Sequence, residues 1–222
     1  MERANLEISI MMKSKVFDGF SKTQCEILHR NLQPYLRQFN KGEIVIQEGD
    51  SVRSIAIIFR GKLIGMKLYY EGDTHLMRTY GPGETVGVEA IASTFETSPL
   101  TFVAGEDSEI LLLPMRGVFE QLEEQFSVKL LFNMIHVLAD DNIKLIYKTE
   151  VLSKRSLRER IMTYLSIIQR KKDSDTFRIL MNQQQFAQYL CVNRSALSYE
   201  LNQMKREGII YFEKDSYRIL NK

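Results

Sequence analysis

NQQQFAQYLCVNRSALSYELNQMKREGIIYFEKDSYRIL, at residues 182–220, is the stretch that decides the fold of the C-terminal part of this chain. It predicts a helix over about 183–190 and a second over about 193–207, which are separated by a tight turn and ended by Gly208. The alternating residues that follow, with a turn at 214–216, predict a small hairpin. Two helices around a tight turn, followed by a hairpin wing, form a winged helix-turn-helix, a motif that reads DNA with its second helix.

The second helix has an apolar face and a polar face. The residues predicted to face the core of the motif are Phe186, Ala187, Leu190, Ala196, Leu197, Leu201 and Met204. Arg194 opens the second helix, where side chains point at base edges, and Arg is the commonest reader of guanine, whereas Lys205 and Arg206 suit phosphates. Asn182 and Asn193 can cap the two helices. The predicted DNA-contacting residues are Gln184, Asn193, Arg194, Ser195, Ser198, Tyr199, Asn202, Lys205 and Arg206.

The charge of the chain is distributed unevenly. Residues 151–222 carry 14 Lys and Arg against 7 Asp and Glu, whereas residues 1–150 carry 16 against 21. The net charges are therefore +7 and −5, and the basic C-terminal part suits a polyanion. A solvated basic face explains the same charge, so charge alone leaves both interpretations open.

Residues 39–113 have a different texture, with short β-rich runs between glycine turns. The runs lie at 43–47, 54–59, 62–70, 75–80, 100–105 and 109–114. The turns lie at Gly42, Gly49-Asp50, Gly61, Gly72-Asp73 and Gly81-Pro82-Gly83. Many short strands at regular spacing predict a double-sheet jelly roll, so the expected fold class is α+β.

Helical patterns lie on both sides of this β region. Ser21 and Gln24 fit a capping box before an apolar face that extends to Leu36, and Pro34 divides that face into two short pieces. From 115 to about 154 leucines recur every seven residues, and a polar Asn at an a position specifies helix pairing. The alternatives are a dimerisation helix over about 120–152 and a helix packed only on its own β domain. The predicted dimer-helix residues are Leu131, Ile135, Leu138, Asn142 and Leu145.

Composition excludes several classes of protein. Without a long apolar run or a secretory segment, the chain is expected to be cytoplasmic and not to enter a membrane. Two cysteines and three scattered histidines predict neither a disulfide framework nor a metal site, although a haem on His75 stays open. A cupin-type metalloenzyme is the alternative from another class, but His75 is the only histidine of the β region, so no enzyme is expected.

Several segments resemble one known family. QQFAQYLCVNRSALSYELNQMKREGII and SLRERIMTYL resemble the helix-turn-helix region of the CRP/FNR family of bacterial regulators. KGEIVIQEGD, FRGKLIG, YGPGETVG and VAGEDSEILLLP resemble strands of its cyclic-nucleotide-binding β-roll. The resemblance covers about residues 16–220. It implies a β-roll sensor (double-stranded β-helix or jelly roll) at 1–114, a long dimerisation helix at 115–152 and a winged helix-turn-helix at 153–222.

The resemblance also implies function and partners. It implies a homodimeric, sequence-specific transcription regulator that binds a double-stranded DNA operator, is controlled by a small effector, and has RNA polymerase as a further partner. Arg194 matches the arginine that opens the family's recognition helix, and Gln184 matches a phosphate-side position. Ser195 stands where many members have Glu, and Tyr199 where most have a second Arg, so the half-site is expected to differ from the usual one.

The effector region departs further from the family. Nucleotide-binding members carry Gly-Glu and then an Arg-Ser pair that grips the phosphate, whereas this chain has residues 87–90 and then 98–100 without an Arg. An ungapped match places Asp141, Leu145 and Ile146 where nucleotide binders have Arg, Thr and Ser. Cyclic AMP is therefore not expected to bind, and a vestigial sensor with effector-independent DNA binding is the alternative. The predicted pocket residues are Gly87, Val88, Glu89, Ala90, Pro99, Leu100, Thr101, Asp141, Leu145 and Ile146. An iron–sulfur sensor is not expected either, because Cys25 is the only N-terminal cysteine.

Overall fold

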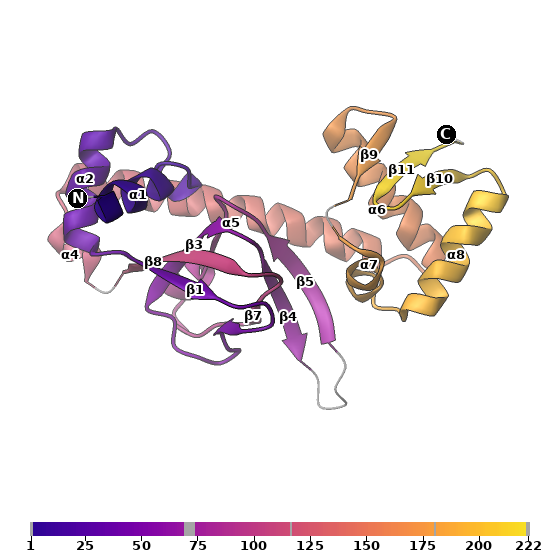
Figure 1. The fold of residues 1–222 in the computed structure, drawn as a ribbon, viewed down its shortest axis with the longest axis horizontal. Coiled ribbons are helices and arrows are strands. Elements are labelled where there is room, and N and C mark those ends of the chain that lie inside the picture. The colour runs from indigo at the N-terminus through magenta and orange to yellow at the C-terminus, as the bar shows by residue number, and fades with distance from the viewer. Residues whose placement is uncertain (1, 69–73, 116, 180, 221–222) are drawn as a thin grey trace. The chain divides into compact units, whose positions relative to one another are not determined.

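The computed structural model describes residues 2–68, 74–115, 117–179 and 181–220 (Figure 1). Contacts between Cα atoms divide the chain into two compact units. The first unit contains residues 1–73 and 77–141, and the second contains residues 74–76 and 142–222. The division of the chain into 1–114, 115–152 and 153–222 stays a prediction.

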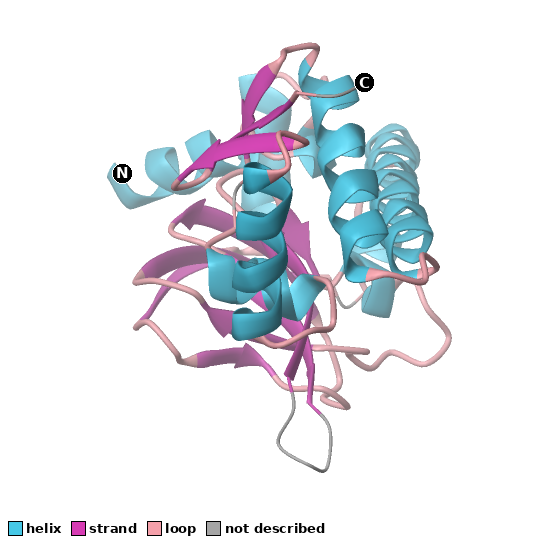
Figure 2. Ribbon diagram, turned by 90° about the vertical axis from the view of Figure 1, so that its right-hand side faces the viewer, coloured by secondary structure: helices cyan, strands magenta, loops and turns pink. Residues whose placement is uncertain are grey.

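The β-roll consists of two four-stranded sheets, with strand orders β1-β8-β3-β6 and β2-β7-β4-β5. The strands, drawn in magenta in Figure 2, are β1 (Tyr35–Phe39), β2 (Ile44–Ile46), β3 (Ser54–Arg60), β4 (Leu63–Leu68), β5 (Thr74–Tyr80), β6 (Thr85–Val86), β7 (Thr101–Ala104) and β8 (Ser108–Pro114). The central pair of the first sheet, β3 and β8, is antiparallel. The double-sheet fold predicted from the spacing of the strands is therefore confirmed. Tyr69, Tyr70 and the predicted Gly72-Asp73 turn lie outside the described residues.

Strand β3 shows how the sequence builds the core. Successive side chains of a strand point to opposite faces of the sheet. Ile55 and Ile57 belong to a cluster with apolar residues of the flanking helices, whereas Ala56 and Ile58 belong to a second cluster made by the strands. The four side chains are fully buried, so an uninterrupted apolar run serves both faces of the sheet.

Helices of the first unit contribute apolar residues to the cluster that contains Ile55 and Ile57. They are α1 (Glu2–Met11), a 3₁₀ turn η1 (Lys15–Phe17), α2 (Lys22–Leu32), α3 (Val88–Ile91), α4 (Val118–Gln121) and α5 (Glu124–Leu152), which continues into the second unit. The Ser21–Gln24 capping box is present. The placement of Leu36 in a helix was wrong, because it lies in β1. Gln33 takes a left-handed conformation at the end of α2, and Pro34 disfavours a helical residue before it.

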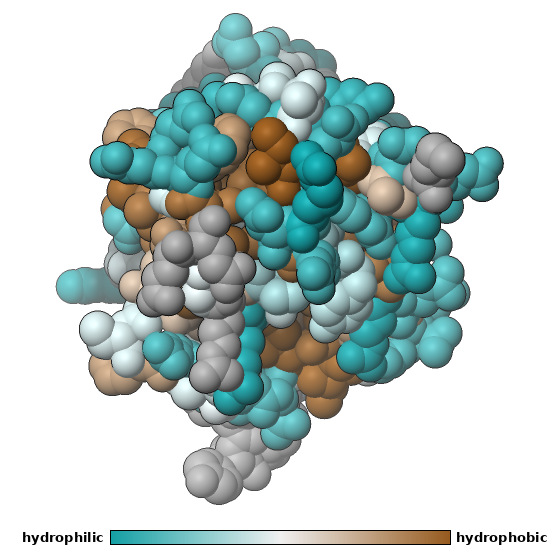
Figure 3. All heavy atoms as spheres, turned by 90° about the vertical axis from the view of Figure 1, so that its left-hand side faces the viewer, coloured by the Kyte–Doolittle hydropathy of each residue, from teal (hydrophilic) through white to brown (hydrophobic). Residues whose placement is uncertain are grey.

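The long helix begins later than the leucine pattern indicates. Gly117 has a φ of +67° before α4, and Leu122 is extended at its end, so the helical pattern that starts at 115 is divided before Glu124. Inside the first unit, Leu130, Met134 and Val137 are buried in the core cluster of the helices. Within the described residues, no helix is long and apolar enough to span a bilayer. On the face drawn in Figure 3, hydrophobic side chains lie in separate patches among hydrophilic ones.

Besides the end of α5, the second unit contains further helices and a small sheet. Its elements are α6 (Leu157–Lys172), β9 (Thr176–Arg178), α7 (Gln183–Tyr189), α8 (Arg194–Arg206), β10 (Ile210–Glu213) and β11 (Ser216–Ile219). The strands form an antiparallel sheet in the order β10-β11-β9. The predicted wing is the β10–β11 hairpin, and the sequence pattern did not indicate its third strand, β9, because three residues are too few to show an alternation.

Candidate nucleic-acid interface

Asparagines begin both helices of the helix-turn-helix, as predicted. Asn182 Oδ1 accepts a hydrogen bond from the backbone N–H of Gln185 at 2.9 Å, and Gln185 Oε1 accepts one from the N–H of Asn182 at 3.0 Å. Asn193 Oδ1 accepts from the N–H of Ala196 at 2.7 Å and from Ser195 Oγ at 2.9 Å. These bonds satisfy backbone donors that a helix start leaves open, and thereby fix where each helix begins.

The two helices pack through the residues predicted for the core of the motif. Helix α7 buries Phe186 and Ala187 fully, together with Leu190 at its C-terminal end. The apolar residues of α8 are fully buried as well. Those residues of α8 are Leu197, Leu201 and Met204. Ala196 is half-buried. The spacing places them on one side of α8 and leaves the opposite side in solvent.

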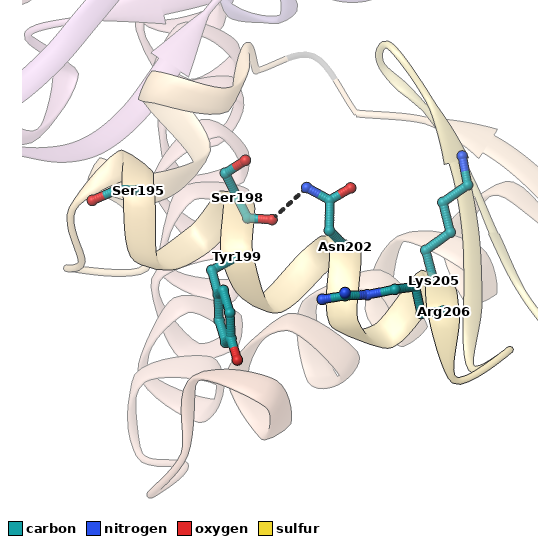
Figure 4. Close-up of a pocket in the computed structure, with 6 residues that line it drawn as sticks. All are labelled: Ser195, Ser198, Tyr199, Asn202, Lys205 and Arg206. Carbon is teal, nitrogen blue, oxygen red and sulfur yellow. Dashed lines mark hydrogen bonds between the residues drawn. The ribbon is translucent and has the colours of Figure 1, made fainter.

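The solvent side of α8 carries a broad, open hollow of about 770 Å³ (Figure 4). It is lined by Ser195, Ser198, Tyr199, Asn202, Lys205 and Arg206. Tyr199 is 67% exposed, and Asn202 Nδ2 donates to the carbonyl oxygen of Ser198 at 2.8 Å. All six residues belong to the predicted DNA-contacting set. The structure therefore brings them together on one surface, while their contact with DNA stays a prediction.

Arg194 and Gln184 lie outside this hollow. Arg194 is the first residue of α8 and is exposed, and Gln184 is exposed in the first turn of α7. Backbone N–H groups and side chains at helix starts suit phosphates and base edges. Both residues are thus free of burial at the two helix starts of the motif.

Lys205 is held by the wing. Its Nζ donates to the carbonyl oxygen of Phe212 at 3.1 Å and lies 4.6 Å from the centre of the Tyr211 ring. Arg206 instead donates from Nη2 to Gln203 on its own helix, at 2.8 Å. Of the two predicted phosphate contacts, Arg206 is therefore tied only locally, whereas Lys205 joins α8 to the wing.

Sequence reasoning missed Arg158, which holds α8 on α6. Its Nε donates to Glu200 Oε1 at 2.6 Å, and its Nη1 and Nη2 donate to the two carboxylate oxygens of Glu207 at 2.6 and 3.1 Å. The hydrogen bonds to Glu207 and Glu200 raise the pKa of Arg158. The hydrogen bond from Arg158, and after it the one from Gln203, lowers the pKa of Glu207. An arginine 42 residues before its partner leaves no local signal in the sequence.

The predicted effector residues lie in several environments. Gly87 takes a φ of +91° before α3, and Val88 and Ala90 are buried in the β-roll, so they contribute packing. Thr101 is buried and its Oγ1 accepts from the N–H of Glu48, at 3.1 Å.

Other predicted pocket residues are more exposed. Leu100 is half-buried against the strand cluster. The exposed Pro99 accepts a hydrogen bond from Lys67. Leu145 and Ile146, which belong to the second unit, are exposed. Their joint role in an effector pocket stays a prediction.

An arginine lies in this region that the sequence comparison with nucleotide binders did not place. Arg78 of β5 donates from Nη1 to Asp141 of α5 and from Nη2 to Glu84 at 2.5 Å. Its guanidinium lies over the ring of Tyr80 at 4.1 Å. Burial raises the pKa of Glu89, and the nearby negative charge of Asp141 adds to the rise. Arg78 is a cation outside the segment where nucleotide binders carry their Arg-Ser pair, and it is already paired with carboxylates of the chain.

The predicted dimer-helix residues divide into two sets. Leu138 is partly buried against the core of its own unit. Leu131, Ile135 and Leu145 are exposed, and Asn142 is exposed as well. The exposed large apolar residues of α5, which are 44–59% exposed, are Val128, Leu131, Phe132, Ile135, Ile143, Leu145 and Ile146. The helix therefore packs on its own domain and also presents an apolar strip, defined by these seven residues, to solvent.

A metal centre finds no support in the part of the chain that the structure describes. No group of three or more His, Cys, Asp or Glu side chains is placed there to hold an ion. Cys25 is buried, Cys191 is exposed, and both are free thiols.

The comparisons with known proteins agree with this geometry. A model of the cyclic nucleotide-binding domain matches residues 36–125, and a model of the Crp-like helix-turn-helix domain matches residues 159–222. The transcriptional activator protein FnrA of Stutzerimonas stutzeri is 25% identical over 196 residues, covering 83% of this chain and 76% of that protein. Lysophospholipase nte1 of Aspergillus terreus is 29% identical over 99 residues, which cover 45% of this chain and only 6% of that enzyme.

A solved structure shares the fold. The c-di-GMP responsive global regulator CLP of Xanthomonas campestris superimposes with a TM-score of 0.71 at 13% identity, over 88% of this chain and 98% of that chain. The lysophospholipase match is confined to the sensor region, whereas FnrA and CLP match along both regions in the same order. With the two domain models matched in succession, the chain belongs to the CRP/FNR family of transcription regulators.

Proposed function

We propose that this regulator binds a specific double-stranded DNA sequence through α8. The observation that carries the proposal is the open hollow on the solvent side of α8, which brings six polar and basic residues together beside the exposed Arg194. Arg194 reads a base edge in the major groove, and Arg206 and Gln184 contact phosphates. Family membership further supports a cytoplasmic protein that acts with RNA polymerase and catalyses no reaction.

The protein acts as a two-fold homodimer. The apolar strip of α5 supports this, because a run of large apolar side chains along one helix is a typical surface for pairing with a second copy. Two recognition helices then contact half-sites one DNA turn apart, roughly 34 Å.

In one model of regulation, a small effector in the β-roll controls DNA binding. Cyclic AMP is not that effector. A phosphate entering the region would meet Asp141 and Glu89, and Arg78 is already engaged by two carboxylates. In the other model, the protein binds DNA without any effector. The ion pairs of Arg78 with Asp141 and Glu84 favour this second model. Calorimetric titration with cyclic AMP is expected to show no binding at micromolar concentration.

Selection of bound duplexes from a random DNA library, with the purified protein at several salt concentrations, tests the central proposal. The expected result is an enriched inverted repeat with half-sites about one turn apart. Enrichment of no motif at any salt concentration would contradict sequence-specific binding.

A further inference from the structure

The Arg78 cluster joins a strand of the β-roll to the long helix. The side chain of Arg78 is 15% exposed, and its carboxylate partners Glu84 and Asp141 are 39% and 25% exposed. Glu84 lies in the turn between β5 and β6 and also accepts from the N–H of Gly81 at 2.8 Å. Asp141, by contrast, lies 63 residues further along the chain on α5, so only this partner connects different elements.

Several hydrogen bonds of α5 in this unit reach the segment that follows α1. Asn133 Nδ2 donates to the carbonyl oxygens of Val16 and Asp18, at 3.0 Å each, and Lys129 donates to that of Gly19. Lys15 reaches Asp140 at 2.5 Å. These bonds hold α5 on the segment that follows α1. The pair between Arg78 and Asp141 adds an ion pair between α5 and β5, where Lys148 of α5 also donates to the carbonyl oxygen of Leu76.

The charges of the cluster are balanced by the chain itself. The guanidinium of Arg78 faces two carboxylates, and a third carboxyl group, the half-buried Glu89, interacts electrostatically with Arg78 and Asp141. An anionic ligand would have to remove Asp141 or Glu84 from Arg78 before it could use that cation. Removal of one partner would leave a partly buried charge without compensation, which is costly.

We propose that the ion pair between Arg78 and Asp141 is an internal substitute for an effector: it holds β5 on α5 in the ligand-free protein, and DNA binding depends on it. The inference rests on the proposed DNA-binding function and adopts its effector-independent version. Helix α5 runs without interruption from Glu124 to Leu152 and is followed by α6 of the DNA-reading unit. A helix that is fixed at Asp141 therefore carries its position along the chain toward that unit.

A double-mutant cycle on ligand-free protein tests the inference. DNA affinity is measured by fluorescence anisotropy on the selected duplex for Arg78→Met, Asp141→Asn and the double variant. Each single change is expected to weaken binding about tenfold, and the double variant should bind no worse than the weaker single variant. Asp140→Asn is the matched control, because it removes the neighbouring carboxylate on α5, which pairs with the exposed Lys15. It should change the affinity less than about twofold.

The outcomes separate the two proposals. Wild-type protein that prefers no duplex over a scrambled one would defeat the proposed function. The proposal that the Arg78–Asp141 pair substitutes for an effector would be overturned by a different result. In that result the wild-type protein binds specifically, and the variants either bind equally well or lose affinity additively.

Hydrogen exchange and a conservative variant cover the case of poor folding. In folded Asp141→Asn, amide exchange over residues 138–146 should accelerate, and unchanged exchange there would contradict the proposal. If Arg78→Met unfolds, Arg78→Lys takes its place in the cycle, because a single ammonium group cannot reproduce the guanidinium that reaches both Asp141 and Glu84. Its loss of affinity should shrink in the Asp141→Asn background, and an equal loss in both backgrounds, with the fold intact by circular dichroism, would also contradict the proposal.

Discussion

Arg158 of α6 grips Glu207 with both terminal nitrogens, so that the last turn of α8 is fastened to another helix by a two-point bond. Such paired hydrogen bonds fix orientation as well as distance, because the guanidinium and the carboxylate are both planar. The third nitrogen of the same guanidinium holds Glu200, about two turns nearer the middle of α8. Helix α8 is therefore held in place by a residue of α6.

Replacement of Arg158 should weaken DNA binding without changing base preference. In Arg158→Ala, α8 loses three hydrogen bonds to α6 and its orientation becomes less restricted. The expected result is a lower melting temperature and lower affinity, with the order of preferred duplexes preserved. Arg155→Ala is the control, because it removes an equal charge from an exposed position nearby. Equal losses in the two variants would mean that only net charge matters.

Arg194 should discriminate between sequences. Arg194→Ala is expected to cost about 1–3 kcal/mol on the selected duplex and much less on a scrambled duplex, because a base contact is lost only where the correct base is present. Fluorescence anisotropy on the two duplexes measures both values. Tyr199→Arg, which restores the commoner family residue, should alter the preferred base at one half-site position. If Arg194→Ala weakens both duplexes alike, Arg194 is an anchor to the backbone.

Phosphate contacts are expected to change the salt dependence of binding. Arg206→Ala should weaken selected and scrambled duplexes by similar factors, and lower the slope of log affinity against log salt by about one per site. Lys205→Ala should lower the slope less, because its ammonium group is hydrogen-bonded to Phe212 of the wing. Titrations at four or more salt concentrations give the slopes. A larger change for Lys205 would show that its ammonium leaves the wing when DNA binds.

How much of this fold the sequence could predict depends on how local each signal is. The caps at Asn182 and Asn193 and the buried face of α8 follow from spacings of a few residues, and the structure confirms them. Arg78 and Asp141 are separated by 63 residues, so their pairing depends on the tertiary fold and could not be read from either segment. Lys205 shows a third case, because its position on the polar face was clear but its hydrogen bond to the wing was not.

The apolar strip of α5 should control the oligomeric state. Light scattering of the wild-type protein is expected to give about twice the chain mass of 25.9 kDa. Ile135→Glu places a charge in the middle of the strip and should shift the protein toward monomer at micromolar concentration. Gln125→Glu, an exposed position at the start of the same helix, should remain dimeric. Monomeric wild-type protein, with or without DNA, would contradict the expected assembly.

Glu89 should make the stability of the protein depend on pH. Burial raises its pKa above the ordinary 4.5, so the folded protein holds this proton at pH values where the unfolded chain has released it. The free energy of unfolding therefore falls as pH rises above about 4.5, and stays lower above the pKa of the folded state. Glu89→Gln removes the ionisation and should raise stability at pH 7, because the partly buried position then carries no charge.

Urea unfolding at pH 4 and pH 7 measures this effect. The gain in Glu89→Gln should shrink at pH 4, where the wild-type carboxyl group is largely protonated in both states. Glu96→Gln, in the exposed loop after α3, should show no such dependence. A gain in Glu89→Gln that is the same at both pH values would point to packing instead of ionisation.

Cys191 carries a side chain where the backbone favours glycine. Its φ of +57° lies in the left-handed region, and it occupies the turn between α7 and α8. A residue with a β-carbon gives up about 1 kcal/mol in this conformation. Cysteine and glycine codons differ by a single nucleotide, so one point mutation can replace Cys191 by glycine and remove this strain. The chain with cysteine at this position is therefore less stable than it could be, and random mutagenesis for thermal tolerance should find Cys191→Gly early.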